Sequence, residues 1–176
     1  MNIRPYKDHL PTIATSAYVD ESACIIGDVS LGNNASVWPM AVIRGDVNKI
    51  TIGNRTNVQD GAILHVTCES KFVPGGKPLT IGDNVTIGHG AVLHACSIAD
   101  LCLIGMNATV LDGAIVKSKT MIAAGSVVAP GKILEGGYLY IGSPAKQARP
   151  LTENELAYLE FSAQHYVELK DDYLFG

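Results

Sequence analysis

The segment IADLCLIGMNATVLDGAIVKSKTMIAAGSVV, residues 98–128, decides the fold of this chain. Every sixth residue within it is aliphatic: Ile98, Ile104, Val110, Val116, Ile122 and Val128. A strict period of six fits neither the 3.6-residue period of an amphipathic helix nor the two-residue alternation of a half-buried strand. A fixed internal period indicates a repeat architecture in which each coil packs only against its neighbours.

The same period continues towards the N-terminus. Its phase slips after RGDVNK (44–49) and again between Leu93 and Ile98, and a segment without the repeat separates Leu64 from Ile81. The remaining periodic positions are also aliphatic: Ile13, Val19, Ile25, Leu31, Val37, Ile43, Ile52, Val58, Leu64, Ile81, Ile87 and Leu93. Alanine stands two residues before many of these positions, and glycine directly follows several of them.

This pattern is the hexapeptide repeat of a parallel β-helix. Three hexapeptides make one triangular coil, the aliphatic side chains point inwards, and coils stack at the spacing of about 4.7–4.9 Å between hydrogen-bonded strands. An ordinary β-sandwich would instead show two-residue alternation with irregular turns. We predict a mainly β fold with a left-handed parallel β-helix domain over residues 11–148, the hand being that of known examples of this repeat.

Two segments do not follow the repeat. Residues 66–80, VTCESKFVPGGKPLT, contain Pro-Gly-Gly and predict a loop between coils. In the C-terminal segment, Thr152 followed by Glu155 matches a capping box, and apolar residues then recur at helical spacing. We predict a helix from about 153 to 170, within a segment 151–172 that packs on the β-helix or on a neighbouring subunit.

The composition is typical of a folded globular chain. The chain has 176 residues, of which 47% are hydrophobic and 17% charged, so disorder is not expected. The net charge of −4 includes no basic run, so neither a nucleic acid nor a membrane is expected as a partner. The N-terminal residues lack the apolar core of a signal peptide, which predicts a cytoplasmic protein. The cysteines show no CxxC spacing and are interpreted as buried free thiols: Cys24, Cys68, Cys96 and Cys102.

The coil phase predicts which histidines come together. It places Leu64 and Leu93 at the same corner of adjacent coils, so the following residues, His65 and His94, project outwards side by side. Their backbones are expected about 5 Å apart. Both imidazoles can then reach one metal ion at the usual metal–nitrogen distance of about 2.0–2.1 Å. Arg44 lies one coil earlier in the same column.

His89 follows Ile87 on a neighbouring face and is not expected to reach that ion within its own chain. A second chain, packed beside the first around a threefold axis, can supply it instead. The histidines thus predict a homotrimer whose metal ion binds to His65 and His94 of one chain and to His89 of the next. Three neutral imidazoles and one open position are typical of catalytic Zn²⁺, and Fe²⁺ or Co²⁺ also accept imidazole. The alternative is that all three are ordinary polar surface residues.

Further polar residues stand close to these histidines in the coil order. Arg44 and Asp46 are predicted to form a salt bridge across the subunit boundary, either as part of the site or only as an interface ion pair. Gln59 faces outwards one side before His65, next to the place where His89 projects. It is predicted to orient a water molecule bound to the metal.

Several motifs together resemble one family. The segments RGD (44–46), NVQDG (57–61), TIGHG (86–90) and GYLYIGSPAK (137–146) are similar to the γ-class carbonic anhydrase-like proteins of the left-handed β-helix superfamily. The resemblance covers nearly the whole chain. It implies a homotrimer with one metal per interface, ligated by His65, His89 and His94. It also implies that Arg44 and Asp46 support the interface, that Gln59 contacts bicarbonate, and that Tyr138 lines the pocket.

The chain departs from the active archetype of that family at two places. Val47 stands where the archetype has a glutamate, and Cys68, followed by Glu69, stands where its acidic proton shuttle is expected. Fast turnover needs proton export, so weak activity is expected. The leading hypothesis is reversible hydration of CO2 by a Zn²⁺-bound hydroxide. The alternatives are an acyl-CoA thioesterase using the same metal site, a metal-free hexapeptide acyltransferase with a histidine as general base, and a non-enzymatic scaffold.

Overall fold

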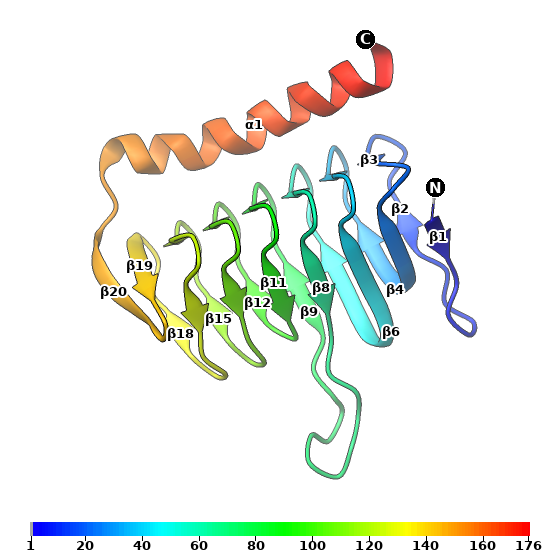
Figure 1. Cartoon of the computed structure of the whole chain (residues 1–176), viewed down its shortest axis with the longest axis horizontal. Coiled ribbons are helices and arrows are strands. Elements are labelled where there is room, and N and C mark those ends of the chain that lie inside the picture. The colour runs from blue at the N-terminus through cyan, green and yellow to red at the C-terminus, as the bar shows by residue number, and fades with distance from the viewer. Residues whose placement is uncertain (1) are drawn as a thin grey trace.

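A computed structural model describes residues 2–176 of the chain. They form a parallel β-helix with a single helix at its C-terminal end (Figure 1). The strands are β1 (Asn2–Arg4), β2 (Thr12–Ile13), β3 (Tyr18–Val19), β4 (Cys24–Leu31), β5 (Ser36–Val37), β6 (Val42–Ile52), β7 (Asn57–Val58), β8 (Ile63–His65), β9 (Leu79–Ile81), β10 (Thr86–Ile87), β11 (Val92–His94), β12 (Ser97–Ile98), β13 (Leu103–Ile104), β14 (Thr109–Val110), β15 (Ile115–Val116), β16 (Met121–Ile122), β17 (Val127–Val128), β18 (Ile133–Leu134), β19 (Tyr138–Gly142) and β20 (Ala145–Pro150). The helix is α1 (Glu153–Phe175).

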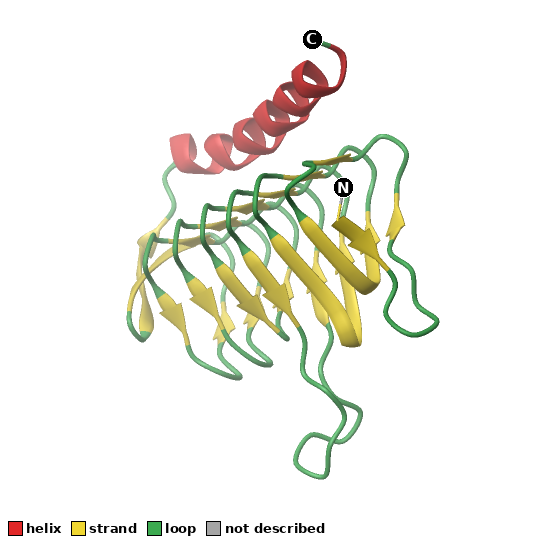
Figure 2. Cartoon of the chain, turned by 45° about the vertical axis from the view of Figure 1, so that its right-hand side comes forward, coloured by secondary structure: helices red, strands yellow, loops and turns green. Residues whose placement is uncertain are grey.

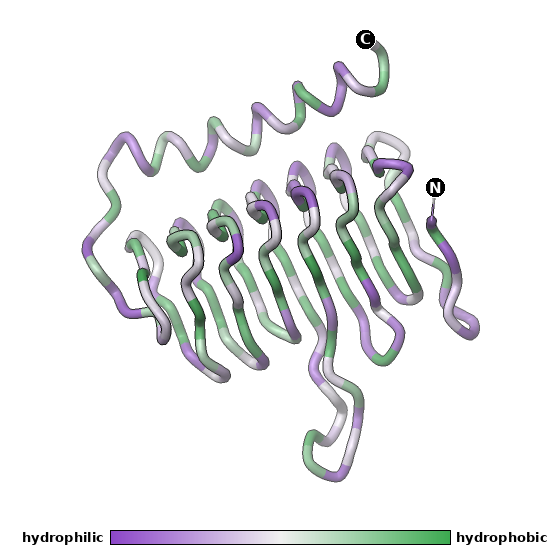
Figure 3. The backbone as a smooth tube through the Cα atoms, in the orientation of Figure 1, coloured by the Kyte–Doolittle hydropathy of each residue, from purple (hydrophilic) through white to green (hydrophobic). Residues whose placement is uncertain are grey.

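The predicted inward ladder is present. Ile25, Ile43, Leu64 and Leu93 pair in register from β4 through β6, β8 and β11, and the ladder continues to Val110 and Val128. All periodic positions from 25 to 128 are buried, with a relative exposure of 4% or less. The two earlier positions, in β2 and β3, are only partly buried because they lie at the open N-terminal end of the stack. Figure 3 shows the apolar residues along the strands and the hydrophilic residues at the corners.

The prism has three faces with different coverings. The histidine face consists of β8, β11, β14 and β17 with the first halves of β4 and β6. The polar face consists of β9, β12, β15 and β18 with the second halves of the same two strands, which turn the corner without a break. The helix face is the eight-stranded sheet from β3 to β20, and α1 lies along it (Figure 2).

The changes of phase correspond to local expansions and contractions of the coil. In β6, residues 46–49 add length to the corner, because Gly27 pairs with Gly45 but Val29 pairs with Ile50. Residues 66–78 leave the prism as a long loop between β8 and β9 (Figure 1), as predicted. After β11 the coil is shortened by one residue, and Ala95 takes a positive φ of 48° to make the tight corner. The first expansion and the loop both lie at the edge that carries His65.

The C-terminal helix begins where the sequence predicts and ends later. Thr152 caps it, and the capping box with Glu155 is complete. The helix continues to Phe175 rather than stopping near residue 170, because its last turns pack against the prism. The Tyr173 ring meets the Trp38 ring edge-on, with 5.2 Å between the ring centroids. No helix in residues 2–176 is long and apolar enough to cross a membrane.

The expectation of four buried thiols is only partly right. All four cysteines are free, and burial raises the pKa of both Cys96 and Cys102 to about 12. Cys24 is partly buried. Cys68 is exposed, because it lies in the loop that leaves the prism. The general preference of free cysteines for the interior does not extend to a segment that has no core of its own.

Candidate metal centre

Two histidines face each other on the histidine face. His65 at the end of β8 and His94 at the end of β11 are register partners, as the coil phase predicts. Their ring centroids are 5.2 Å apart, and His65 Nδ1 lies 3.1 Å from His94 Nε2. That separation is short enough for both nitrogens to contact one ion at about 2.0–2.1 Å.

The other nitrogen of each ring faces a carboxylate. His65 Nε2 lies 3.0 Å from Asp46 Oδ1, and His94 Nδ1 lies 2.8 Å from Asp112 Oδ2. An ionised carboxylate can only accept a hydrogen bond, so each imidazole carries its proton on the side of the aspartate. When both rings are neutral, the two facing nitrogens both present lone pairs, and lone pairs 3.1 Å apart repel unless a cation lies between them. The chemistry of this donor set therefore fits a metal ion, as carboxylate–histidine pairs do in known metal sites.

Both aspartates are held in their ionised form. Burial opposes ionisation of Asp46, but hydrogen bonds from Arg44 and His65 outweigh it and lower the pKa of this carboxyl. Burial also opposes ionisation of Asp112, and hydrogen bonds from Thr67 and His94 likewise lower its pKa. Each carboxylate thus keeps the acceptor role that fixes the proton on its histidine.

Asp112 was not identified from the sequence. It follows Leu111, which continues the outward column of Arg44, His65 and His94 one coil later. Its second oxygen accepts a hydrogen bond from Thr67 at the base of the 66–78 loop, so one carboxylate ties the loop to His94. The outward column could have predicted this contact, because an acidic residue next to the column on one coil is within reach of the histidine on the adjacent coil.

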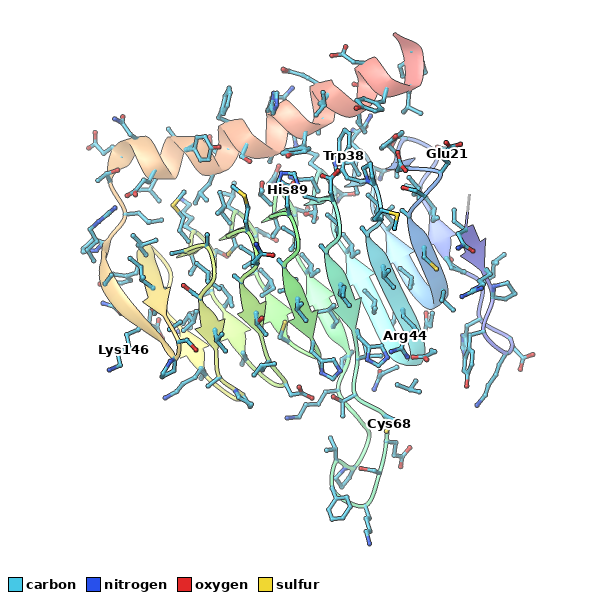
Figure 4. The ribbon with its side chains drawn as sticks, in the orientation of Figure 1. Glu21, Trp38, Arg44, Cys68, His89 and Lys146 are labelled. Atoms are coloured by element: carbon cyan, nitrogen blue, oxygen red, sulfur yellow. The ribbon has the colours of Figure 1, made fainter. Side chains whose placement is uncertain are left out.

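His89 lies apart from this pair. It sits at the corner between the helix face and the histidine face, whereas Arg44 lies at the opposite edge, beside the loop (Figure 4). Its side chain is 48% exposed, and its Nδ1 lies 2.8 Å from Asp60 Oδ2. The Nε2 atom therefore points a lone pair outwards. Within residues 2–176, no three His, Cys, Asp or Glu side chains come close enough to hold one ion.

Gln59 lies next to the His89 corner, on the helix face. It is only 5% exposed, and its Nε2 donates to Asn57 Oδ1 at 3.0 Å. Asn57 in turn donates to Thr86 Oγ1 at 3.1 Å, and Thr86 shares a hydrogen bond of 2.8 Å with Ser162 of α1. This chain fixes which end of the Gln59 amide is presented, so its Oε1 remains available as an acceptor.

Arg44 and Asp46 form an ion pair within one chain, in which Arg44 Nη1 lies 2.5 Å from Asp46 Oδ2. The two residues stand two apart in β6, so their side chains lie on the same side of the strand. The salt bridge across a subunit boundary stays a prediction. Tyr138 lies on β19, three strands beyond β10 in the sheet, and packs against the core. Its place in the pocket of the metal site stays a prediction.

The residues that replace acidic groups of the archetype are both accessible. Val47 lies in the expanded corner of β6 and is 42% exposed. Cys68 lies at the base of the loop and is exposed. The two acidic side chains that contact the histidine pair, Asp46 and Asp112, are both occupied by histidine and a second donor.

Comparison with known proteins gives close relatives along the full chain. The sequence is 52% identical to protein YrdA of Escherichia coli over 172 residues, which is 98% of this chain and 94% of that protein. It is 43% identical over 164 residues to the mitochondrial γ carbonic anhydrase 2 of Arabidopsis thaliana, covering 92% of this chain but 58% of the plant protein. No family model matches the sequence.

Solved structures show the same architecture. A hexapeptide transferase family protein from Anaplasma phagocytophilum superposes with a TM-score of 0.90 at 40% identity and covers 97% of both chains. A candidate acetyltransferase from Bacillus cereus gives a TM-score of 0.91 at 41% identity, covering 97% of this chain and 95% of that one.

Proposed function

Because the chain belongs to the γ-carbonic anhydrase-like family of hexapeptide-repeat proteins, we propose that it is a metal-dependent homotrimer that hydrates CO2 reversibly at its subunit interfaces. The observation that carries this proposal is the close approach of His65 Nδ1 to His94 Nε2, 3.1 Å apart, with a carboxylate at the other nitrogen of each ring. Asp46 and Asp112 impose this arrangement on the two rings. His89, with its own aspartate at Asp60, is the third ligand and comes from the next chain.

The coverings of the three faces support a trimer. The helix covers one face, and the N-terminal part of another carries the hydroxyl side chains of Ser30, Thr51, Thr80 and Ser97. That column ends in two exposed aliphatic residues, Ile115 and Ile133. On the histidine face the outward column is aliphatic along most of its length, and nothing in residues 2–176 covers it: Val42, Ile63, Val92, Thr109 and Val127. Ile63 is 47% exposed. An uncovered apolar face of this kind marks an interaction surface.

The two edges of that face are complementary. One edge carries His89 at the corner before β11, and the other carries His65 and His94 at the strand ends. A head-to-tail contact joins one edge of a chain to the opposite edge of the next, and such contacts close into a ring when the rotation allows it. Three prisms around a threefold axis would bury the aliphatic columns centrally and form three equivalent three-histidine sites.

The residues of the site have distinct roles in this proposal. The three histidines hold Zn²⁺, or Fe²⁺ or Co²⁺, which when bound supplies hydroxide at neutral pH as the nucleophile for CO2. Gln59 Oε1 accepts a hydrogen bond from the reacting water or from the hydroxyl group of bicarbonate. Arg44 holds Asp46, and Asp46 holds the His65 ring. Since Val47 and Cys68 replace acidic groups of the archetype, proton export depends on other groups and turnover is slow.

Metal content and assembly mass, measured together, test this proposal. The wild-type protein is expected to purify as a trimer with about one metal per chain. His65→Ala removes a ligand and should lose most of the metal, whereas His9→Ala, an exposed histidine far from the site in the fold, should retain it. Unchanged metal content in His65→Ala, or a monomeric wild type, would contradict the proposal.

A second candidate is acyl transfer or thioester hydrolysis. It is favoured by the His89–Asp60 pair, which resembles a general base oriented by a carboxylate and opens onto an apolar cavity. CO2 hydration and the turnover of a panel of acyl-CoAs, assayed with metal present and after its removal, separate the candidates. Metal-free acyl transfer would favour the second candidate, and CO2 hydration that is lost with the metal would favour the first.

A further inference from the structure

A cavity of about 510 Å³ lies between α1 and the helix face. Its floor is a column of small residues on successive coils, Gly88, Gly105 and Ala123, each of which directly follows an inward aliphatic residue. Gln59 occupies the same position one coil earlier and closes the column at the end beside His89. The volume lies within the range of small-molecule sites.

The walls of this cavity are apolar along most of its length. Leu103, Met121 and Leu139 project from adjacent strands on one side, and Phe161 and Tyr158 of α1 form the opposite wall. Thr86 and Ser162 also line it, but their hydroxyl groups bond to each other and are not available to a ligand. Methionine side chains adapt readily to a flexible apolar ligand.

Free polar groups of the floor and corner gather at one end. Gln59 is only 5% exposed, and within residues 2–176 one N–H of its amide donates to Asn57, while its second N–H and its Oε1 make no hydrogen bond. The outward Nε2 of His89 lies at the same end. At the other end the same column continues into Ile141, an apolar residue. The floor of the cavity is therefore polar at the Gln59 end and apolar at the Ile141 end.

We propose that this cavity binds the unbranched aliphatic chain of an acyl compound, with its carbonyl head beside His89 and accepting a hydrogen bond from the second N–H of the Gln59 amide. The chain would lie along the small-residue column, which spans three coil steps or about 14 Å from Gln59 to Ala123. A floor of small residues that ends at a polar side chain fits a linear chain with one head group better than a compact polar metabolite. One chain forms the whole cavity, so binding of the aliphatic chain does not depend on the trimer. Only the position of the head group beside the metal centre rests on the proposed function.

Ligand titration by calorimetry tests the inference, with octanoate, decanoate and dodecanoate as probes. Affinity should rise about fourfold for each added methylene group, the ratio expected for full burial of a CH2 group. Ala123→Leu places a larger side chain on the floor and should weaken dodecanoate binding at least about tenfold. Ala99→Leu is the matched control, because Ala99 follows Ile98 as Ala123 follows Ile122 but lies on the polar face. It should leave binding unchanged.

Dodecanoyl-CoA, titrated in parallel, distinguishes a free fatty acid from a thioester as the source of the chain. Weakening of both ligands by Ala123→Leu, with thermal unfolding unchanged, supports the inference. Affinity that does not depend on chain length, or equal affinities in the two leucine variants, would overturn it. His65→Ala should lose metal but keep dodecanoate binding, so a failure of the metal proposal and a failure of the cavity proposal give different results.

Discussion

The carboxylate of Asp112 should control how tightly the metal binds, although we do not propose it as a ligand. It accepts hydrogen bonds from His94 Nδ1 at 2.8 Å and from the Thr67 hydroxyl group. Asp112→Asn keeps the size of the side chain but leaves one acceptor oxygen for two donors. If Thr67 keeps that oxygen, the His94 proton is free to move to Nε2 and block the lone pair that faces His65.

Replacing such an outer partner of a ligating histidine lowers metal affinity by about 10- to 100-fold. That ratio equals about 1.4–2.7 kcal/mol of binding free energy. We expect this loss of zinc affinity in Asp112→Asn, measured by competition with a chelator of known affinity. Asp28→Asn makes the same charge change at a corner where no side-chain hydrogen bond to the carboxylate occurs within residues 2–176, and it should bind zinc like the wild type.

The pH dependence follows from the same contact. Because the pKa of Asp112 is lowered in the folded chain, its hydrogen bonds stabilise the fold at pH values above the usual aspartate pKa of about 3.9. That contribution is lost as the pH falls through the lowered pKa, and Asp112→Asn should not show this loss. Equal zinc affinities for Asp112→Asn and Asp28→Asn at neutral pH would refute the reasoning.

Three further predictions concern the fold. Hydrogen bonds from Arg149 and Thr152 lower the pKa of Glu155 to about 2. Its contribution to stability is therefore present above about pH 4.5 and lost as the pH falls towards 2. Thermal unfolding of Glu155→Gln should not show this loss of stability in acid. Leu93→Ala leaves a cavity in the central ladder and should lower the free energy of unfolding by about 2–5 kcal/mol in denaturant titration, and a loss under 1 kcal/mol would argue against the close packing of that ladder. Iodoacetamide at pH 8 should label Cys68 but not Cys96 or Cys102. Mass spectrometry of Cys68→Ser should show that the fast-reacting site is lost. Rapid labelling of Cys96 or Cys102 would contradict their burial.

Much of the fold follows from the sequence because each coil repeats the last. Once Leu64 and Leu93 are assigned to one inward column, the pairing of His65 with His94 needs no further information. The same logic separates His89 from the pair, since it lies at another corner. In a repeat protein, residues at the same position of successive repeats lie next to each other in the structure.

The partners of the histidines follow from the period only in part. Asp46 reaches His65 only because residues 46–49 expand the corner of β6, and the period is lost at that corner. Asp60 is different, because the pairing of Asn57 and Val58 with Thr86 and Ile87 places it directly beside His89 in the register. Asp112 stands one residue beyond the column of His94, so the register places it near that histidine without specifying the contact. The end of α1 was placed too early because its last turns are held by aromatic contacts with Trp38 rather than by an aliphatic stripe.

Metal content of mixed trimers tests the sharing of one ion between chains most directly. His65→Ala and His89→Ala each damage all three sites of a homotrimer, so each alone should bind little zinc. In trimers reassembled from an equal mixture, about three quarters contain both variants, and each of these has one interface with an intact set of histidines. Recovery of about a quarter of the wild-type zinc is therefore expected. A mixture that binds no more zinc than the mean of the two separate variants would show that no site is shared between chains.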